Sequence, residues 1–327
     1  MQATTQSSAP RRDTVQMLGD AFTRYGIVIA FFALCVILAF ANPYFMTRGN
    51  VVNVLRQTSI NGILAVGMTF VVLTGGIDLS VGSVLAFCGI VSASFVTGLA
   101  PWNPGFAVLL GVFCGLVMGS VNGLLVAKLR VPPFVATLGM LSVARGLTFI
   151  YNNGMPVPNL SAQYRFIGQG LLIGIPVPVL VFAFVAVVAW FVLRYTTYGR
   201  YIYAVGGNER SAKTSGINTR RIILSVYAVA GALAGLSAQV LTARTTSALP
   251  QAGVAYELDA IAAVVIGGTS LSGGIGGVTG TIFGALIIGV INNGLDLMGV
   301  SSYYQQVIKG TIIVLAVLLD YSRQRND

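Results

Sequence analysis

Long apolar segments separated by short polar ones run along the chain from about residue 25 onward. Most of them are close to the roughly 20 residues that a helix needs to cross a hydrocarbon layer of about 30 Å, and the segment at 258–270 is shorter. We therefore predict an all-α fold, a polytopic transmembrane helical bundle of about ten spans. The predicted spans are 25–45, 58–76, 82–100, 106–127, 133–151, 173–193, 222–243, 258–270, 278–299 and 303–319.

Glycine pairs interrupt the pattern near residues 76 and 270, so eight to eleven spans remain possible. The two interruptions resemble each other, because GGIDLSVG at 75–82 aligns without a gap with GGTSLSGG at 267–274. Asn122 similarly matches Asn293. We predict inverted repeats of spans two to five and seven to ten, which are typical of transporters. Chance similarity between glycine-rich membrane segments is the alternative.

Glycines also recur every four residues in two places, from Gly111 to Gly123 and from Gly276 to Gly284. Such stripes let two helix backbones approach closely, and this approach holds helices together in a membrane. We expect close helix packing there.

Composition supports a membrane protein, because only 9% of the 327 residues are charged and 55% are hydrophobic, whereas soluble domains carry about 25% charged residues. The net charge of +10 comes from Lys and Arg in loops on alternate sides of the spans. This positive-inside pattern places both termini in the cytoplasm and argues against nucleic acid as a partner. We predict cytoplasmic tails at 1–22 and 321–327 around a permease domain at 23–320, with membrane lipid as its surroundings.

Several kinds of catalytic chemistry are missing from the sequence. The chain has no histidine and no G-x-x-x-x-G-K-[ST] sequence, which excludes a Ser-His-Asp triad and a P-loop. Cys35, Cys88 and Cys114 lie within apolar segments and share no short spacing, so neither a disulfide framework nor a metal site is indicated. We expect no enzyme activity, no metal and no cofactor in this chain.

Charged residues within apolar segments are the candidates for a transport role, because their burial in a membrane is costly. They are Asp78, Arg145, Glu257, Asp259, Asp296 and Lys309. Asp78 is the strongest carboxylate candidate. With Ser80 it can cap the free amides of a broken helix, or it can line the pathway itself.

Four stretches together resemble the membrane permease subunits of bacterial sugar ATP-binding-cassette importers, within the branched-chain amino acid and monosaccharide permease superfamily. They are AVGMTFVVLTGGIDLSVGS at 65–83, GRYIYAVGGNERSAKTSGI at 199–217, YELDAIAAVVIGGTSLSGG at 256–274 and NNGLDLMGVSSYYQQVIKG at 292–310. The resemblance covers about residues 40–320. It implies a homodimer in the inner membrane, an ATPase with two fused nucleotide-binding domains that uses ATP and Mg, and a periplasmic sugar-binding protein.

The resemblance gives the polar loop 196–220, between spans six and seven, a role in coupling to the ATPase through a short helix. Its residues fit one: Asn208 or Ser211 can cap it, Ala212 is small enough for close contact, and Gly216 can end it. An ordinary positive-inside loop is the alternative. The predicted coupling residues are Gly206, Gly207, Asn208, Glu209, Ser211, Ala212, Gly216 and Ile217.

A neutral sugar is held by hydrogen bonds and aromatic faces, so polar residues near the repeat interface are candidates for the substrate pathway. They are Asn61, Asp78, Asn122, Asn293, Tyr303, Tyr304 and Gln305. The two tyrosines equally fit an interfacial aromatic belt.

The expected function is ATP-driven import of ribose or a related monosaccharide by alternating access. An ion-coupled secondary sugar carrier is the competing class, and the same kind of permease serving xylose, galactose, inositol or an autoinducer is the competing substrate assignment. A membrane scaffold without transport is disfavoured by the repeats and the glycine breaks.

Overall fold

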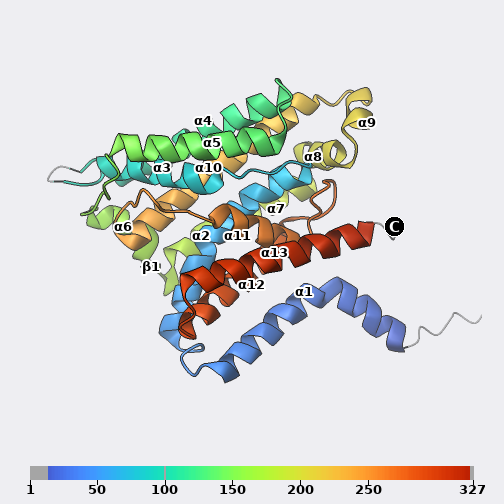
Figure 1. Cartoon of the computed structure of the whole chain (residues 1–327), viewed down its shortest axis with the longest axis horizontal. Coiled ribbons are helices and arrows are strands. Elements are labelled where there is room, and N and C mark those ends of the chain that lie inside the picture. The colour runs from blue at the N-terminus through green and yellow to red at the C-terminus, as the bar shows by residue number, and fades with distance from the viewer. Residues whose placement is uncertain (1–13, 99–100, 325–327) are drawn as a thin grey trace, which may run out of the picture.

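The computed structural model describes residues 14–98 and 101–324, which form thirteen helices and one short two-stranded hairpin (Figure 1). The first helices are α1 (Thr14–Ala41), α2 (Arg48–Leu73), α3 (Val81–Phe95), α4 (Pro104–Ala127), α5 (Pro133–Tyr151) and α6 (Ala162–Gln169). The hairpin strands β1 (Leu171–Leu172) and β2 (Ile175–Pro176) are antiparallel. The remaining helices are α7 (Val177–Tyr195), α8 (Thr197–Gly207), α9 (Glu209–Thr214), α10 (Thr219–Thr245), α11 (Tyr256–Ile266), α12 (Val278–Leu297) and α13 (Ser302–Gln324). The all-α prediction is confirmed.

Each of the ten predicted spans contains one helix, and the main differences lie at the helix ends. Helix α2 begins about ten residues before the predicted start at 58, because polar side chains in its first turns have partners elsewhere. Asn53, for example, accepts a hydrogen bond of 2.8 Å from Arg244. Helix α1 already includes residues 14–22 of the predicted tail. Residues 1–13 and 325–327 of the two predicted tails lie outside the described residues.

Five of the described helices, α4, α5, α7, α10 and α12, are long and apolar enough to cross a membrane. By contrast, α3 and α11 have 15 and 11 residues. At 1.5 Å per residue these two helices extend only about 22 and 16 Å, less than a hydrocarbon core. Each follows a non-helical stretch, 74–80 or 246–255. The third and eighth predicted spans are therefore shorter than full crossings.

Helix contacts follow the predicted pairing of spans two to five with spans seven to ten. The first helices of the two halves, α2 and α10, pack on each other. Helix α4 of the first half packs on α10, and its counterpart α12 packs on α2. Helix α3 contacts α5, and correspondingly α11 contacts α13. Exchanging α2–α5 with α10–α13 preserves these contacts, as a repeat requires, although the contact of α4 with α5 has no counterpart of similar size between α12 and α13.

The similarity of GGIDLSVG and GGTSLSGG has another origin than this repeat. The first stretch joins α2 to α3 and the second joins α11 to α12, and these connections do not correspond under the exchange. They lie side by side instead, since the Gly274 amide donates a 3.0 Å hydrogen bond to the Leu73 carbonyl. The spacing of 192 relates two neighbouring loops at one end of the bundle, so it was wrong evidence for the repeat.

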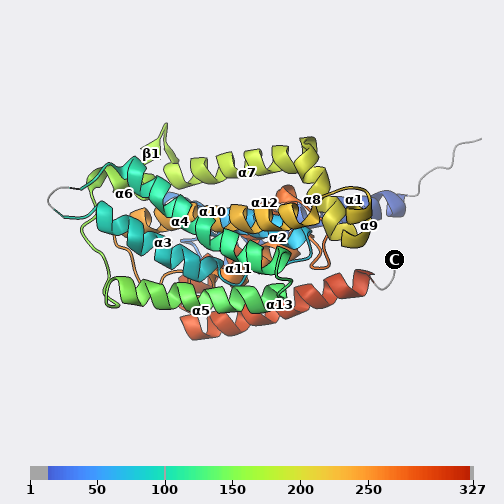
Figure 2. The same cartoon turned by 90° about the horizontal axis from the view of Figure 1, so that it is seen from above.

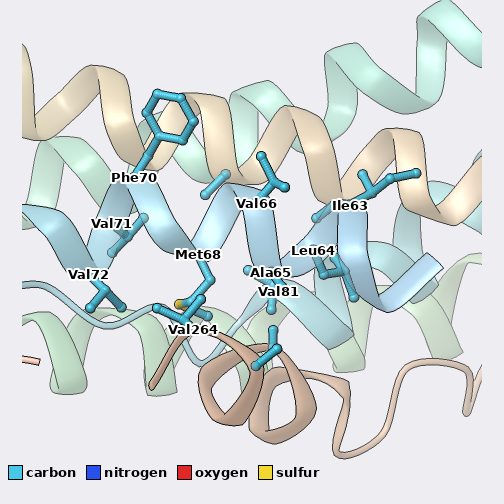
Figure 3. Packing of buried hydrophobic residues seen from close by; sticks show 14 of the residues in the cluster. Ile63, Leu64, Ala65, Val66, Met68, Phe70, Val71, Val72, Val81 and Val264 are labelled. Carbon is cyan, nitrogen blue, oxygen red and sulfur yellow. The ribbon is translucent and has the colours of Figure 1, made fainter. Parts of the chain in front are cut away.

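Helix α2 forms the centre of the bundle. Every residue from Thr58 to Leu73 is buried, and contacts come from α7, α10, α11 and α12. Figure 3 shows Ile63, Val66 and Phe70 among the side chains that extend from α2, with Val264 of α11 close to Met68. A helix that is apolar on all sides requires this central position.

The glycine stripes place backbone against backbone, as predicted. A Cβ atom on Gly115 of α4 would overlap the Gly231 carbonyl oxygen of α10, and Gly111 similarly abuts Gly235. In the second half, Gly284 of α12 abuts the Ala263 carbonyl of α11. Larger side chains at these positions would separate the helices.

Candidate translocation and coupling sites

The two short helices α3 and α11 begin next to each other inside the bundle. The backbone of Gly82, in the first turn of α3, packs against the Gly253 carbonyl just before α11. Arg145 of α5 holds the stretch of chain that leads into α11, because it donates hydrogen bonds of 2.6 and 3.0 Å to the carbonyls of Pro250 and Ala252. Helices interrupted within a membrane, with their amino ends facing one another, are a recurring feature of transporter binding sites.

Asp78 organises the chain just before α3. Its Oδ1 accepts hydrogen bonds from the Ser80 amide at 2.8 Å and the Ser80 hydroxyl at 2.6 Å. Asn122 of α4 donates a 2.9 Å hydrogen bond to the same hydroxyl oxygen. All three side chains are buried. The geometry is that of an Asx turn just before the helix, so Asp78 stabilises this turn. Ser80, the N-cap residue of α3, makes no side-chain hydrogen bond to the free amides of that helix, and the capping and pathway interpretations of Asp78 both stay predictions.

A second buried polar cluster surrounds Asp259 in the first turn of α11. Its Oδ2 accepts hydrogen bonds from Lys309 Nζ at 3.1 Å, Asn292 Nδ2 at 3.3 Å and Asn61 Nδ2 at 3.4 Å. Lys309 and Asp259 form the one ion pair among the described residues. Asn61 lies midway along α2, so this charged cluster sits deep within the bundle.

The two clusters occupy corresponding places in the two repeats. In the first, Asn122 of α4 binds the turn at the start of α3; in the second, Asn292 of α12 binds the carboxylate at the start of α11. The sequence match had paired Asn122 with Asn293. That neighbour instead exchanges two 2.8 Å hydrogen bonds with Asn50 of α2.

The remaining predicted pathway residues lie at the start of α13, and among the described residues none of them hydrogen-bonds to either cluster. Tyr303 and Tyr304 are 82% and 70% exposed, and Gln305 donates hydrogen bonds to Asp296 and the Val300 carbonyl. The structure therefore distributes the predicted pathway residues over four places rather than one.

Three residues of the Asp259 cluster were not assigned to the pathway from sequence: Asp259, Asn292 and Lys309. The signal for Asp259 and Lys309 was present, since both are charges within apolar segments. Nothing in the sequence distinguished Asn292 from the adjacent Asn293.

The predicted coupling loop forms two helices, α8 and α9, at one end of the bundle (Figure 2). Asn208 caps α9, as expected, because its Oδ1 accepts a 2.9 Å hydrogen bond from the Ser211 amide. Gly216 ends the segment with φ of 86°, a conformation that favours glycine. Glu209 accepts a 3.0 Å hydrogen bond from Thr219 at the start of α10.

Ala212 does not lie on the outer surface of this segment. Its side chain is 4% exposed and belongs to the main hydrophobic core. Its small size therefore serves packing within the chain, and not the close outside contact that the sequence suggested. The exposed residues of α9 are Glu209, Arg210, Ser211, Lys213 and Thr214.

Helix α8 directly contacts the α11–α12 connection (267–277) and the end of α2, where the α2–α3 connection (74–80) begins; these two connections are called here the glycine loops. Gly206 packs against the Leu73 carbonyl and the Gly274 amide, where a Cβ atom would overlap them. Tyr203 donates a 2.9 Å hydrogen bond to the Gly276 carbonyl. Burial raises the pKa of Tyr203, and nearby Arg194 only partly opposes this, so the phenol keeps its proton. A shift of α8 would therefore move the carboxyl end of α2 and the amino end of α12 together.

A cavity of about 900 Å³ lies beside α9 at the same end of the bundle. Arg130, Arg210, Lys213 and Arg220 line it, with Glu209 as its one acidic residue. It is open to approach from outside and positively charged, which suits an acidic partner surface.

Repeats with interrupted helices that meet inside the bundle, and an outer helical segment that contacts both of them, define a membrane transport protein. Residues 50–317 match the family described as "Branched-chain amino acid transport system / permease component". The chain belongs to this family of multi-pass membrane permeases, as the resemblance of its motifs had indicated.

Relatives match along nearly the whole chain. It is 49% identical over 300 residues to the ribose import permease protein RbsC of Bacillus subtilis (strain 168), covering 91% of this chain and 92% of that protein. Identity to the ribose import permease protein RbsC of Escherichia coli (strain K12) is also 49%, over 91% and 93% of the two chains. The D-allose transport system permease protein AlsC of the same strain is 40% identical over 91% of each. No solved structure matches the chain.

Proposed function

We propose that this chain is the membrane-spanning permease subunit of an ATP-driven importer that moves ribose or a related monosaccharide from periplasm to cytoplasm by alternating access. The observation that carries this proposal is the 49% identity, over nine-tenths of both chains, to ribose import permeases from two bacteria. The D-allose relative at 40% identity makes an aldose substrate the shared expectation.

The proposal includes the partners of such an importer. Two copies of the chain form a homodimer in the inner membrane with both termini in the cytoplasm. An ATPase with two fused nucleotide-binding domains hydrolyses ATP with Mg, and a periplasmic binding protein delivers the sugar. The charge bias of the loops supports this orientation, and it puts α8 and α9 on the ATPase side.

Coupling passes through α8 and α9 in this proposal. The exposed charges of α9 contact the ATPase, and α8 transmits its motion to the glycine loops that Gly206 and Tyr203 contact. Because those loops end α2 and begin α12, one movement reaches both repeats. The meeting point of α3 and α11 is the part of the sugar path that this movement opens and closes.

Charge reversal on α9 tests the coupling step. In proteoliposomes with the ATPase and the binding protein, Arg210→Glu together with Lys213→Glu should lower ATP-driven ribose uptake on the order of tenfold or more, since like charges that face each other across an interface cost several kcal/mol. Lys128→Glu is the control, because Lys128 is an exposed residue at the carboxyl end of α4 that does not line the cavity beside α9. Unchanged uptake in the double variant would refute the coupling role.

One observation favours a second candidate, an ion-coupled sugar carrier. The Asp259–Lys309 pair lies deep in the bundle, where carriers place carboxylates that exchange protons. Uptake driven by a proton or sodium gradient in proteoliposomes without any ATPase would support this candidate. Uptake that depends on ATP and the ATPase would exclude it.

A further inference from the structure

Two adjoining cavities run along α7, and together they have an apolar part and a cationic part. The first, of about 500 Å³, lies between α2, α7 and α12. The second, of about 750 Å³, lies at the carboxyl end of α7 beside α8. Trp190 and Thr279 line both cavities, so the two share a boundary and can hold one extended ligand.

The walls of the first cavity are almost entirely hydrocarbon. Phe182, Ala186 and Val187 of α7 face Ile282 and Leu286 of α12 across it. It follows α7 from Val179 to Trp190, which at 1.5 Å per residue is about 16 Å. This length and lining suit a flexible alkyl chain rather than a sugar, which would need several hydrogen-bond partners.

The second cavity carries positive charge that no carboxylate balances. Arg194 and Arg200 line it, and neither forms an ion pair among the described residues. Among the described residues, the Arg200 side chain donates a hydrogen bond only to the Thr197 hydroxyl, at 3.1 Å. The first turn of α12, from Gly277 to Gly280, lines the opposite wall. Its N-cap Gly277 supplies no side-chain acceptor to the free amides, and these amides add positive potential to that of the arginines.

The cavities lie where the chain meets the bilayer. Figure 2 shows α7 along one edge of the bundle, opposite α5 and α13. Phe184, Val187 and Phe191 on α7 are exposed, as expected for a lipid-facing helix. Trp190 lines both cavities, and its ring lies 5.3 Å from that of Tyr195, which lines the second. Aromatic residues of this kind are enriched at the headgroup level.

We propose that α7, α8 and α12 form a binding site for an anionic phospholipid of the cytoplasmic leaflet. One acyl chain occupies the apolar cavity, and Arg194 and Arg200 bind the phosphate. Basic pockets at the cytoplasmic ends of membrane helices bind such headgroups by the same chemistry. A soluble ATPase cannot fill the apolar part, because that part extends along α7 into the depth of the membrane.

The site also touches the coupling segment. Arg200 belongs to α8, and Gly276 and Gly277 of the second cavity belong to the loop that Tyr203 holds. A bound lipid therefore connects α7 to the elements that move with α8.

Fluorescence quenching tests the proposal, because the chain has two tryptophans, Trp102 and Trp190. In the Trp102→Phe variant only Trp190 reports. The chain is reconstituted in phosphatidylcholine bilayers that contain a fixed fraction of lipid with brominated acyl chains, either phosphatidylglycerol or phosphatidylcholine. Stronger quenching by brominated phosphatidylglycerol than by brominated phosphatidylcholine is the expected result.

Replacing both arginines, Arg194→Gln with Arg200→Gln, should remove that preference. Each arginine near an anionic headgroup contributes about fivefold in affinity, so the pair should contribute about thirtyfold. The control removes two cytoplasmic charges elsewhere, Lys128→Gln with Arg130→Gln, and should keep the preference.

Four results would overturn the proposal. The first three are equal quenching by both lipids, a preference that survives in the Arg194 and Arg200 double variant, and loss of the preference on adding millimolar inorganic phosphate, which would identify a site for the free anion. Quenching that is lost only when the chain dimerises would assign the groove to a second copy and would also contradict the proposal.

Discussion

The buried ion pair between Asp259 and Lys309 makes a quantitative prediction. In the single variant Lys309→Met, the carboxylate keeps only the long hydrogen bonds of 3.3 and 3.4 Å from Asn292 and Asn61. Its other oxygen, Oδ1, has no hydrogen-bond partner in the described part of the chain. An uncompensated charge would then remain in a site where the Asp259 side chain is 3% exposed.

The expected cost follows from the burial of the two partners. Removing one member of a fully buried pair costs about 3 to 5 kcal/mol. Lys309 keeps 19% of its side chain exposed, so water screens part of the interaction and we expect about 3 kcal/mol. For a chain of this size, that loss corresponds to a fall in Tm of roughly 4 °C.

The double variant Asp259→Asn with Lys309→Met distinguishes charge from packing. It removes both charges and leaves an amide that Asn61 and Asn292 can still bind, so the free energy of unfolding should return to within about 1 kcal/mol of the natural chain. Thermal unfolding followed by circular dichroism in one detergent measures all three proteins. Lys128→Met, an exposed charge at the end of α4, is the control and should change stability by less than about 0.5 kcal/mol.

Two outcomes would refute this reasoning. If the double variant were as unstable as Lys309→Met, the loss would come from packing around the lysine stem and not from an unpaired charge. If Lys309→Met unfolded at the temperature of the natural chain, the pair would be solvated in the membrane-embedded protein.

The remaining predictions concern backbone packing and a helix cap. Gly115→Ala should lower the Tm clearly, because its Cβ would overlap the Gly231 carbonyl. The control Gly139→Ala should not lower it, because nothing lies within 4 Å of the added Cβ. Equal shifts in Tm would contradict the close contact of α4 and α10. Asn208→Ala should remove the acceptor for the Ser211 amide and destabilise α9 by about 1 kcal/mol. Faster hydrogen exchange of the α9 amides, restored by Asn208→Asp, would be the expected result, and unchanged exchange would show that the cap is not needed.

Much of the fold could be predicted from the sequence because apolar length is a direct signal in membrane proteins. Each predicted span contains a helix. The predicted eighth span, 258–270, was already too short for a full crossing, and α11 within it has 11 residues. The predicted third span, 82–100, had the length of a full crossing because apolar residues beyond Phe95, where α3 ends, were included in it. An apolar segment indicates that its residues are buried in the protein or the membrane. It does not indicate whether the backbone of that segment is helical.

The coupling segment was predictable for a different reason, since its polarity stands out within an apolar chain. Local rules identified the cap at Asn208 and the stop at Gly216. They could not reveal that Ala212 faces the core, because α9 has only six residues and offers no period from which to infer an inner face.

The buried polar clusters were the least predictable part of the site. Asn61 and Asp259 are separated by 198 positions, and no local pattern brings them together. The inverted repeat could have suggested the second cluster once the first was known, since Asn292 corresponds to Asn122 in position and in role. The sequence paired Asn122 with the adjacent Asn293 and so missed this correspondence by one position. The match at spacing 192 did not help, because it aligned two loops that touch rather than two that correspond.

Ribose uptake by the reconstituted importer is the direct test of ATP-driven import through this chain. Proteoliposomes contain the chain and its ATPase, with ATP and Mg enclosed on the ATPase side and the sugar-bound binding protein outside. We predict that labelled ribose accumulates only when ATP, ATPase and binding protein are all present, and that Arg210→Glu with Lys213→Glu abolishes most of this uptake. Accumulation without the ATPase, driven by an ion gradient alone, would contradict it.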